Sequence, residues 1–382
     1  MELSVKQRLS MIEAYMRGSG FSYETGLTEN LYLSLRAKPF VILAGISGTG
    51  KTRLARMFAA AMGAGGENGR ALTVPVRPDW SDPSDLFGHT DLNGRFIPGA
   101  AIDFIKRAEL DPARPYFLCL DEMNLARVEY YMSDILSVME TRELGEDGRV
   151  VTDVLVPERC YGSDSAAREK YGAMRLPDNL YIIGTVNMDE TTFPFSKKVL
   201  DRANTIEFSH VNLVPDLNAA KDVADVQTLG NDFLRSEYTR LSHCADMRGA
   251  VLDICGELQI INEILEKTDS QIGYRIRDEI VFYMLYNERA GLLKRDDAFD
   301  NEIMQKILPR LGGSGAGLKR MLCELFGYCA GDRGTLRAAG GAVSGQMFDA
   351  VSGGECRYKK SAEKLAQMVR RVEDDGFTSF WL

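Results

Sequence analysis

Five short apolar runs recur through the first 210 residues, and polar or helix-forming segments separate most of them. Each run has the length and composition of a buried β-strand. The runs lie at residues 40–44, 71–76, 116–120, 180–186 and 203–208. Strands that alternate with helices favour a parallel sheet that is covered on both faces. The predicted fold class is therefore α/β, with a three-layer core around a five-stranded parallel sheet.

After about residue 210 the apolar positions follow a helical period instead. Examples of this spacing are Ile254, Leu258 and Ile261. No strand is predicted between residues 230 and 330, and a last helix is predicted over residues 361–373 with Ser361 as its N-cap. The aromatic tail at residues 377–382 either docks a partner or folds back onto the helices. The second half is therefore predicted to be helical.

These patterns divide the chain of 382 residues, which is long enough for two or three domains, into four predicted parts. The parts are a helical lead-in at residues 1–38, an α/β core at 39–210, a helical lid at 211–330 and a C-terminal extension at 331–382. Within the core, a Glu-Asp-Gly turn predicts a β-hairpin insert near residues 143–176.

The composition is that of an ordinary globular protein, with 45% hydrophobic and 26% charged residues. The net charge of −9 argues against a protein that grips nucleic acid over its whole surface. Seven cysteines without a C-x-x-C pair and three histidines without ligand spacing argue against a disulfide framework or a zinc site. The sequence shows no signal-peptide core and no apolar run near the ~20 residues of a membrane span. We therefore expect a cytoplasmic protein without membrane contact.

Residues 45–52 read Gly-Ile-Ser-Gly-Thr-Gly-Lys-Thr and fit the phosphate-loop pattern G-x-x-x-x-G-K-[ST]. The segment follows the first predicted strand and opens a predicted helix at residues 52–62, which is the context that the pattern requires. Glycines let backbone N–H groups wrap around phosphate oxygens, and the helix N-terminus adds positive potential. Lys51 is expected to reach the β- and γ-phosphates, and Thr52 to offer its hydroxyl to Mg²⁺. The predicted nucleotide-binding residues are Gly45, Ser47, Gly48, Thr49, Gly50, Lys51 and Thr52.

Two carboxylates, Asp121 and Glu122, end the third predicted strand. Ligands of a parallel sheet bind at the carboxyl ends of its strands, so Asp121 is expected beside the phosphate loop. A carboxylate there can hold hydrated Mg²⁺, which makes Thr52 and Asp121 the predicted metal ligands. Glu122 is the predicted catalytic residue that orients and polarises the attacking water.

The next strand ends in Asn187, which could bind the γ-phosphate or the attacking water. Arg202 comes 15 residues later, just before the fifth predicted strand. An arginine there could reach the phosphates of a neighbouring subunit, and its planar guanidinium is suited to stabilising charge on a transferring phosphoryl group. We therefore predict catalytic roles for Asn187 and Arg202, with a surface ion pair as the other interpretation of Arg202.

Together these motifs resemble those of the AAA+ superfamily over roughly residues 35–330. More narrowly, the segments 45–52, 120–125 and 184–189 resemble the McrB-type branch, the nucleotide-driven subunit of modification-dependent restriction systems. The third segment departs from the M-N-x-x-D signature of that branch, because valine replaces the methionine and the aspartate comes one residue early.

The resemblance also suggests roles for single residues. By resemblance, Asn187 takes the sensor-1 role and Arg202 the arginine-finger role. Either Arg275 or Arg277 would be the sensor-2 arginine of a helical lid that binds the nucleotide. The choice stays open, since residues two apart on a helix point about 160° away from each other.

The resemblance implies a hexameric ring with each active site at a subunit junction, and turnover of ATP or GTP with Mg²⁺. It implies the motor subunit of a McrBC-like DNA restriction or anti-phage defence complex, with a McrC-like nuclease as partner. McrB-type proteins favour GTP whereas most of the superfamily uses ATP, and the phosphate loop contacts no base. Only 44 residues precede that loop, so no separate DNA-reading domain is expected. DNA would be contacted through pore loops or through partners.

Two other functions fit the same motifs. A MoxR-like ATPase chaperone that remodels protein complexes would use the same residues. A nucleotide-dependent assembly switch with little turnover would need the phosphate loop but not Glu122, Asn187 and Arg202. The presence of these three residues favours hydrolysis, and the Asp-Glu-Met-Asn and Asn-Met-Asp patterns favour the restriction function over the chaperone.

Overall fold

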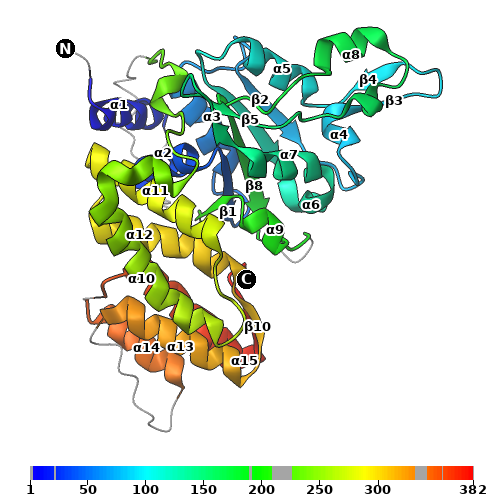
Figure 1. The fold of residues 1–382 in the computed structure, drawn as a ribbon. Coiled ribbons are helices and arrows are strands. Elements are labelled where there is room, and N and C mark those ends of the chain that lie inside the picture. The colour runs from blue at the N-terminus through cyan, green and yellow to red at the C-terminus, as the bar shows by residue number, and fades with distance from the viewer. Residues whose placement is uncertain are drawn as a thin grey trace. The chain divides into compact units, whose positions relative to one another are not determined.

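The computed structural model describes residues 3–20, 23–188, 192–208, 226–331, 342–354 and 356–381. The chain forms two compact units, Met1–His243 and Cys244–Leu382 (Figure 1). The finer division into four parts stays a prediction. Across the described ranges, no helix combines the length and the hydropathy that are needed to cross a membrane.

The first unit is built on a five-stranded sheet in the order β2-β5-β8-β1-β9, and its neighbouring strands pair in parallel. The strands are β1 (Phe40–Gly45), β2 (Ala71–Pro75), β5 (Tyr116–Asp121), β8 (Leu180–Asn187) and β9 (Asn204–Glu207). Every residue of β1 is buried, as are all but the last residues of β5 and β8. The predicted α/β fold class is confirmed, and each predicted strand matches an observed one to within one residue at either end.

Helices cover both faces of this sheet. α3 (Lys51–Ala61) joins β1 to β2 on one face, where α1 (Val5–Gly18) also lies, and α5 (Ile102–Leu110) and α7 (Ser133–Val138) lie on the other face (Figure 1). This arrangement follows from right-handed crossovers between parallel strands, because the path along the sheet reverses direction at β2. The remaining helices of the unit are α2 (Leu27–Ala37), α4 (Ser84–Phe87), α6 (Val128–Tyr131), α8 (Ser165–Tyr171) and α9 (Lys197–Leu200).

Two antiparallel hairpins are inserted into this plan. The first pairs β3 (Gly88–Thr90) with β4 (Phe96–Pro98), and the second pairs β6 (Glu143–Leu144) with β7 (Val150–Val151). The second hairpin lies within the segment where the sequence predicts one. The first was not predicted, because its strands are only three residues long and carry no alternating pattern.

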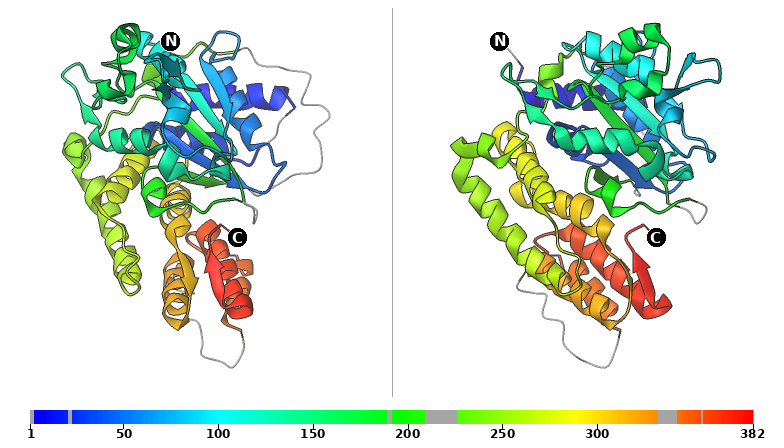
Figure 2. Two further views of the ribbon diagram at one scale, coloured as in Figure 1. Left: turned by 90° about the vertical axis from the view of Figure 1, so that its right-hand side faces the viewer. Right: turned by 45° about the vertical axis from the view of Figure 1, so that its right-hand side comes forward.

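The second unit is helical apart from one short strand pair. Its helices are α10 (Arg248–Glu266), α11 (Tyr274–Ala290), α12 (Arg295–Glu302), α13 (Ala316–Ala330), α14 (Val343–Ser352) and α15 (Lys359–Asp375). α15 packs against both α13 and α14, and these helices lie side by side in both views of Figure 2. The predicted helical character of the second half is confirmed for the described residues.

Two predictions for this unit are wrong. β10 (Gly312–Ser314) pairs antiparallel with β11 (Phe377–Ser379), inside the region where no strand was predicted. α15 begins two residues before Ser361, so Ser361 is not its N-cap but a fully buried helix residue. Asp300 takes the capping role instead, because its carboxylate accepts from the backbone N–H of Ser361 at 2.9 Å.

The aromatic tail folds back onto its own unit. β11 provides the strand pairing, Phe380 is fully buried, and the indole Nε1 of Trp381 donates a 2.9 Å hydrogen bond to the carbonyl oxygen of Pro309. Of the two interpretations of the tail, the structure therefore supports packing onto the helices.

Candidate nucleotide-binding site

The carboxyl ends of β1, β5 and β8 lie next to one another in the sheet. The register places Gly45 of β1 opposite Asn187 of β8, and Leu120 of β5 opposite Gly184 of β8. The loops that leave these three strands therefore lie together at the carboxyl end of the sheet, which is where parallel sheets bind their ligands. The structure thus brings together the phosphate loop, the acidic pair and Asn187, as the sequence predicts.

The phosphate loop turns through two glycines that hold left-handed backbone conformations. Gly48 has φ +79° and Gly50 has φ +91°, values that L-residues with a side chain rarely adopt. Gly45 is required for a different reason, since a Cβ there would lie 2.1 Å from the carbonyl oxygen of Phe208. α3 begins directly after Gly50, so its unpaired N–H groups face the loop. Within the loop, Ser47 is exposed, and the Thr49 hydroxyl donates to the carbonyl oxygen of Ile46 at 3.0 Å.

Lys51 lies at the start of α3 and is only 5% exposed. Its Nζ donates hydrogen bonds to the carbonyl oxygens of Gly45 at 3.0 Å and Ile46 at 2.7 Å. Burial lowers the pKa of the Lys51 ammonium, while the negative charges of Asp121 and Glu122 act in the opposite direction. The ammonium thus lies inside the loop whose backbone N–H groups would bind phosphate.

Lys51→Ala is expected to weaken binding of a nucleoside triphosphate by about 10- to 100-fold, because a hydrogen bond to a charged group is worth roughly 1.5–3 kcal/mol. Equilibrium binding of a fluorescent ATP or GTP analogue measures this loss. Lys106→Ala is the matched control, since Lys106 pairs with Glu109 at 2.6 Å on α5. Unchanged affinity in the Lys51 variant would remove this lysine from the site.

The predicted metal ligands are in direct contact. The Thr52 hydroxyl donates to a carboxylate oxygen of Asp121 at 2.5 Å, which joins the start of α3 to the end of β5. A hydroxyl and a carboxylate are hard oxygen donors of the kind that Mg²⁺ prefers, and Mg²⁺ uses few protein ligands when phosphates supply others. The residues present therefore fit the metal that the fold class implies.

Glu122 follows Asp121 in a left-handed conformation, with φ 51° and ψ 47°. This conformation is uncommon for a residue other than glycine, and it turns the chain sharply at the end of β5. The exposed carboxylate of Glu122 accepts a 2.9 Å hydrogen bond from the side-chain amide of Asn187. Two of the three predicted catalytic residues thus meet, and Asn187 fixes the orientation of the Glu122 carboxylate.

Thr185 is a positioning residue of this site that the sequence analysis missed. Its hydroxyl donates to Asp121 at 2.7 Å and accepts from the backbone N–H of Glu122 at 3.0 Å. Thr185 lies two residues before Asn187 on β8, so both side chains point to the same face of the sheet. The two-residue spacing from Asn187 could have revealed Thr185, because a polar residue on this face near the end of β8 must lie close to Asp121 and Glu122.

Thr185→Val is expected to slow nucleotide turnover by about tenfold, because it removes one hydrogen bond to Asp121 and one from Glu122 while keeping the shape of the side chain. Thr205→Val is the matched control, since Thr205 is a buried residue of the same sheet whose hydroxyl has no hydrogen-bond partner. Steady-state turnover with thermal melting of both variants tests this. Equal rates in the two variants would contradict the role of Thr185.

Arg202 is tied into its own subunit. Its guanidinium forms an ion pair with Glu140, Nε donates to the carbonyl oxygen of Leu136 at 2.8 Å, and a further bond goes to the carbonyl oxygen of Lys198. The Arg202 side chain is only 12% exposed. An arginine-finger role for Arg202 stays a prediction, and it requires the ion pair with Glu140 to open.

The two sensor-2 candidates lie on α11 in the second unit. Arg277 pairs with Asp278 at 2.7 Å and stands over the ring of Tyr274 at 4.8 Å, whereas Arg275 is exposed. Their role toward nucleotide stays a prediction. Asp189, which completes the third motif of the family resemblance, lies outside the described residues.

Comparison with known families gives two matches on this chain. Residues 40–203 match the family described as AAA domain (dynein-related subfamily), and residues 223–377 match a domain of unknown function, DUF8727. The first match contains the whole candidate site apart from the residues on α11.

Similar proteins are matched over parts of their length. The chain is 27% identical over 189 residues to the Type IV methyl-directed restriction enzyme EcoKMcrB subunit of Escherichia coli, which covers 49% of this chain and 38% of that protein. It is 26% identical over 218 residues to the Lon protease of Mycoplasma mycoides, which covers 55% of this chain and 24% of that protein. A crystal structure of a provisionally assigned ATPase from Cytophaga hutchinsonii matches with 15% identity and a TM-score of 0.42, over 79% of this chain and 87% of that one.

The sheet order, the phosphate loop and the neighbouring acidic pair define a nucleotide-binding α/β domain, and the AAA-domain match agrees with this class. Residues 40–203 of this chain match an AAA domain, and they hold the phosphate loop and the acidic pair of the candidate site. The AAA domain match supports the predicted AAA+ resemblance over residues 40–203, and the narrower McrB-type branch belongs to the proposal that follows.

Proposed function

We propose that this protein hydrolyses ATP or GTP at the carboxyl ends of β1, β5 and β8, with Mg²⁺. The observation that carries the proposal is the hydrogen bond between Asn187 and Glu122 beside the contact between Thr52 and Asp121. A site that only bound nucleotide would need the phosphate loop but no oriented glutamate. Turnover of ATP and GTP measured side by side tests the proposal and establishes the preferred base.

In this mechanism the chain's own residues bind, orient and polarise. Phosphate oxygens replace the carbonyls of Gly45 and Ile46 as acceptors for the Lys51 ammonium, which then neutralises negative charge on the triphosphate. Glu122 orients the attacking water with its carboxylate, and Asn187 keeps that carboxylate in place. Thr52 and Asp121 would hold Mg²⁺, which supplies positive charge to the phosphate oxygens.

We further propose that the protein is the motor subunit of a McrBC-like DNA restriction or anti-phage defence complex. The match to the EcoKMcrB subunit supports this proposal, although the aligned region spans 38% of that relative. The proposal includes a hexameric ring in the cytoplasm, a McrC-like nuclease as partner, and contact with DNA through pore loops or through that partner. Sizing in a non-hydrolysable nucleotide analogue tests the ring, and co-purification with a McrC-like nuclease tests the partner.

A second candidate function is that of a MoxR-like ATPase that remodels protein complexes. The match to the Lon protease supports it, because that relative acts on proteins. Stimulation of turnover separates the two candidates. Double-stranded DNA with the nuclease should stimulate a restriction motor, whereas an unfolded or complexed protein substrate should stimulate a remodelling ATPase. A switch would show nucleotide-dependent assembly without appreciable turnover in either case.

A further inference from the structure

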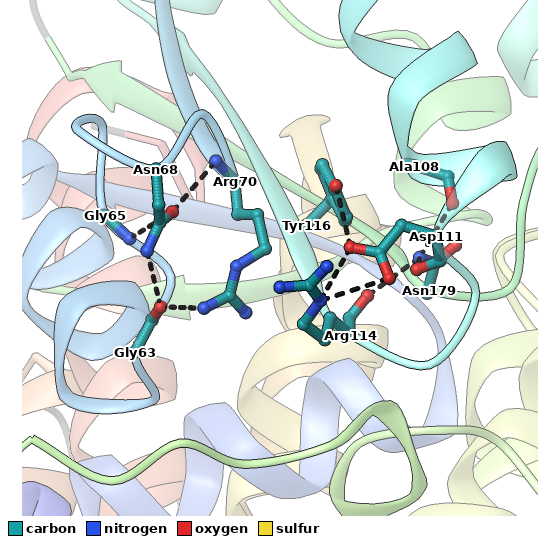
Figure 3. Close-up of polar contacts among 9 residues, drawn as sticks. All are labelled: Gly63, Gly65, Asn68, Arg70, Ala108, Asp111, Arg114, Tyr116 and Asn179. Atoms are coloured by element: carbon teal, nitrogen blue, oxygen red, sulfur yellow. Dashed lines mark hydrogen bonds and ion pairs between the residues drawn. The ribbon is translucent and has the colours of Figure 1, made fainter.

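The opposite end of the central sheet, where the parallel strands begin, carries a group of arginines that the nucleotide site does not use. Arg70 directly precedes β2 and Arg114 lies two residues before β5, whereas the site residue Asp121 ends β5. A strand rises about 3.3 Å per residue, so the length of β5 separates the two ends of the sheet by roughly 17 Å. These arginines are therefore separate from the nucleotide site, and Figure 3 shows the surroundings of Arg70 and Arg114.

The turn between α3 and β2 is organised by the side chain of Asn68. Its Oδ1 accepts from the backbone N–H groups of Gly65 and Arg70, each at 3.2 Å, and its Nδ2 donates to the carbonyl oxygen of Gly63 at 2.9 Å. These bonds fix the backbone of Arg70, a residue that is 6% exposed. Arg70 is thus held in one place by a structured turn.

The facing turn, between α5 and β5, is held just as firmly. The side-chain amide of Asn179 donates to the carbonyl oxygens of Ala108, Asp111 and Arg114 at 2.8–3.0 Å. Asp111 is already occupied, because its carboxylate accepts from Arg114 Nε at 2.8 Å and from the Tyr116 hydroxyl at 3.0 Å. Figure 3 shows the guanidinium groups of Arg70 and Arg114 facing each other between the two turns.

Among the described residues Arg70 has no ion-pair partner, although the negative charges of Asp111 and Glu67 also act on it. Nη2 donates to the carbonyl oxygen of Gly63, but the buried Nη1 has no hydrogen-bond partner, and no carboxylate of the described residues lies within ion-pair distance of Arg70. Burial and then the positive charge of Arg114 lower the pKa of Arg70. A buried guanidinium with an unpaired N–H group and a facing positive charge is unfavourable, and a bound anion would reduce that cost.

Two more charged residues, Arg107 and Glu67, lie near the turn between α3 and β2. Arg107 of α5 reaches the turn, since a Cβ on Gly69 would lie 2.5 Å from its Nη1. Glu67 is exposed on the same turn, where solvent screens its charge. The Arg114 side chain is 56% exposed, so the group of arginines is reachable from solvent.

We propose that Arg70, Arg114 and Arg107 form an anion-binding site for a phosphate group at the amino-terminal edge of the sheet. Guanidinium forks match the oxygens of a phosphate in a bidentate manner, and a phosphate near −2 in charge compensates two facing guanidiniums better than a carboxylate does. The phosphate group comes either from free phosphate or nucleotide, or from the backbone of a nucleic acid.

The test uses the full chain with Lys51→Ala, so that phosphate at the nucleotide site contributes little. Thermal melting is followed against inorganic phosphate, with chloride keeping the ionic strength constant. Arg70→Met and Arg114→Ala are each expected to weaken the apparent phosphate affinity by about tenfold or more. Arg149→Ala is the control, because Arg149 is also exposed and pairs with a nearby aspartate in its own turn. Equal phosphate responses in all four chains would overturn the proposal.

Arg70→Met supplies a second, independent readout. Methionine keeps much of the side-chain volume and removes the unpaired charge, so this variant is expected to melt at a higher temperature than its parent when no phosphate is present. A lower melting temperature together with an unchanged phosphate response would contradict the site. If Arg70→Met does not fold, the phosphate affinity of Arg114→Ala still tests the site.

The source of the phosphate is found by comparing two probes in the same chains. Inorganic phosphate is one probe, and a short fluorescent DNA duplex followed by anisotropy is the other. Binding that depends on Arg70 and Arg114 supports the site with either probe, and the tighter probe identifies the source. Arginine-independent binding of both probes overturns it. Because the parent chain is impaired in nucleotide binding, the result does not depend on the proposed hydrolysis.

Discussion

Glu122→Gln is expected to lower the rate of nucleotide hydrolysis by about 10³-fold while leaving nucleotide binding nearly unchanged. The substitution keeps the length of the side chain, and its amide oxygen can still accept the hydrogen bond from Asn187. What is lost is the negative charge that polarises the attacking water. The contacts of Lys51, Thr52 and Asp121 do not involve the Glu122 side chain, so the binding half of the site stays intact.

Single-turnover hydrolysis and equilibrium nucleotide binding, measured on the same preparation, separate the two effects. Glu169→Gln on the exposed face of α8 is the control, since it makes the same chemical change away from the site. A Glu122→Gln chain that hydrolyses at the parent rate would exclude Glu122 from the mechanism. A chain that fails to bind would instead show that Glu122 belongs to the binding half.

Arg202→Ala is expected to lower turnover by about 10³-fold, provided that Arg202 acts on the phosphates of a neighbouring subunit. The decisive result comes from mixing. A ring that contains Arg202→Ala and Glu122→Gln subunits has junctions where an intact Glu122 meets an intact Arg202. The mixture is therefore expected to hydrolyse nucleotide much faster than either variant alone.

The contacts of Arg202 make a control necessary. Its ion pair with Glu140 and its bonds to backbone carbonyls connect α7 and α9, so Arg202→Ala could lower stability without any catalytic role. Arg202→Lys, which keeps the charge but not the planar fork, and Glu140→Gln, which removes the ion pair, are melted and assayed in parallel. A mixture that assembles fully by sizing and stays as slow as its components would exclude action in trans.

The parts of the site that the sequence predicts are those encoded by local pattern. The glycines of the loop, Lys51 and Thr52 lie within one segment of eight residues, and strand adjacency in a parallel sheet brings Asp121 and Asn187 to the same end of the sheet. Thr185 was missed because its two hydrogen bonds exist only once β5 and β8 are paired. An ion pair was one of the two interpretations of Arg202, but its partner Glu140 could not be identified from the sequence because the two residues are 62 positions apart.

The errors in the second unit have the same origin. Serine is a common N-cap residue, which favoured Ser361. In the structure Asp300 of another helix provides the capping carboxylate, and α15 starts two residues earlier. Gly312–Ser314 has no apolar residue and no strand pattern, and it becomes β10 only because β11 pairs with it from the end of the chain. Long-range partners decide both cases, and a single sequence does not display them.

The left-handed backbone at Glu122 has a consequence for attempts to make this protein more heat-resistant. A residue with a Cβ is disfavoured in that conformation by roughly 1–2 kcal/mol, and glycine is not. A library screened only for survival at high temperature would therefore enrich glycine at position 122, together with the loss of the carboxylate that turnover needs. Thermostability selections on this protein therefore have to measure activity at the same time.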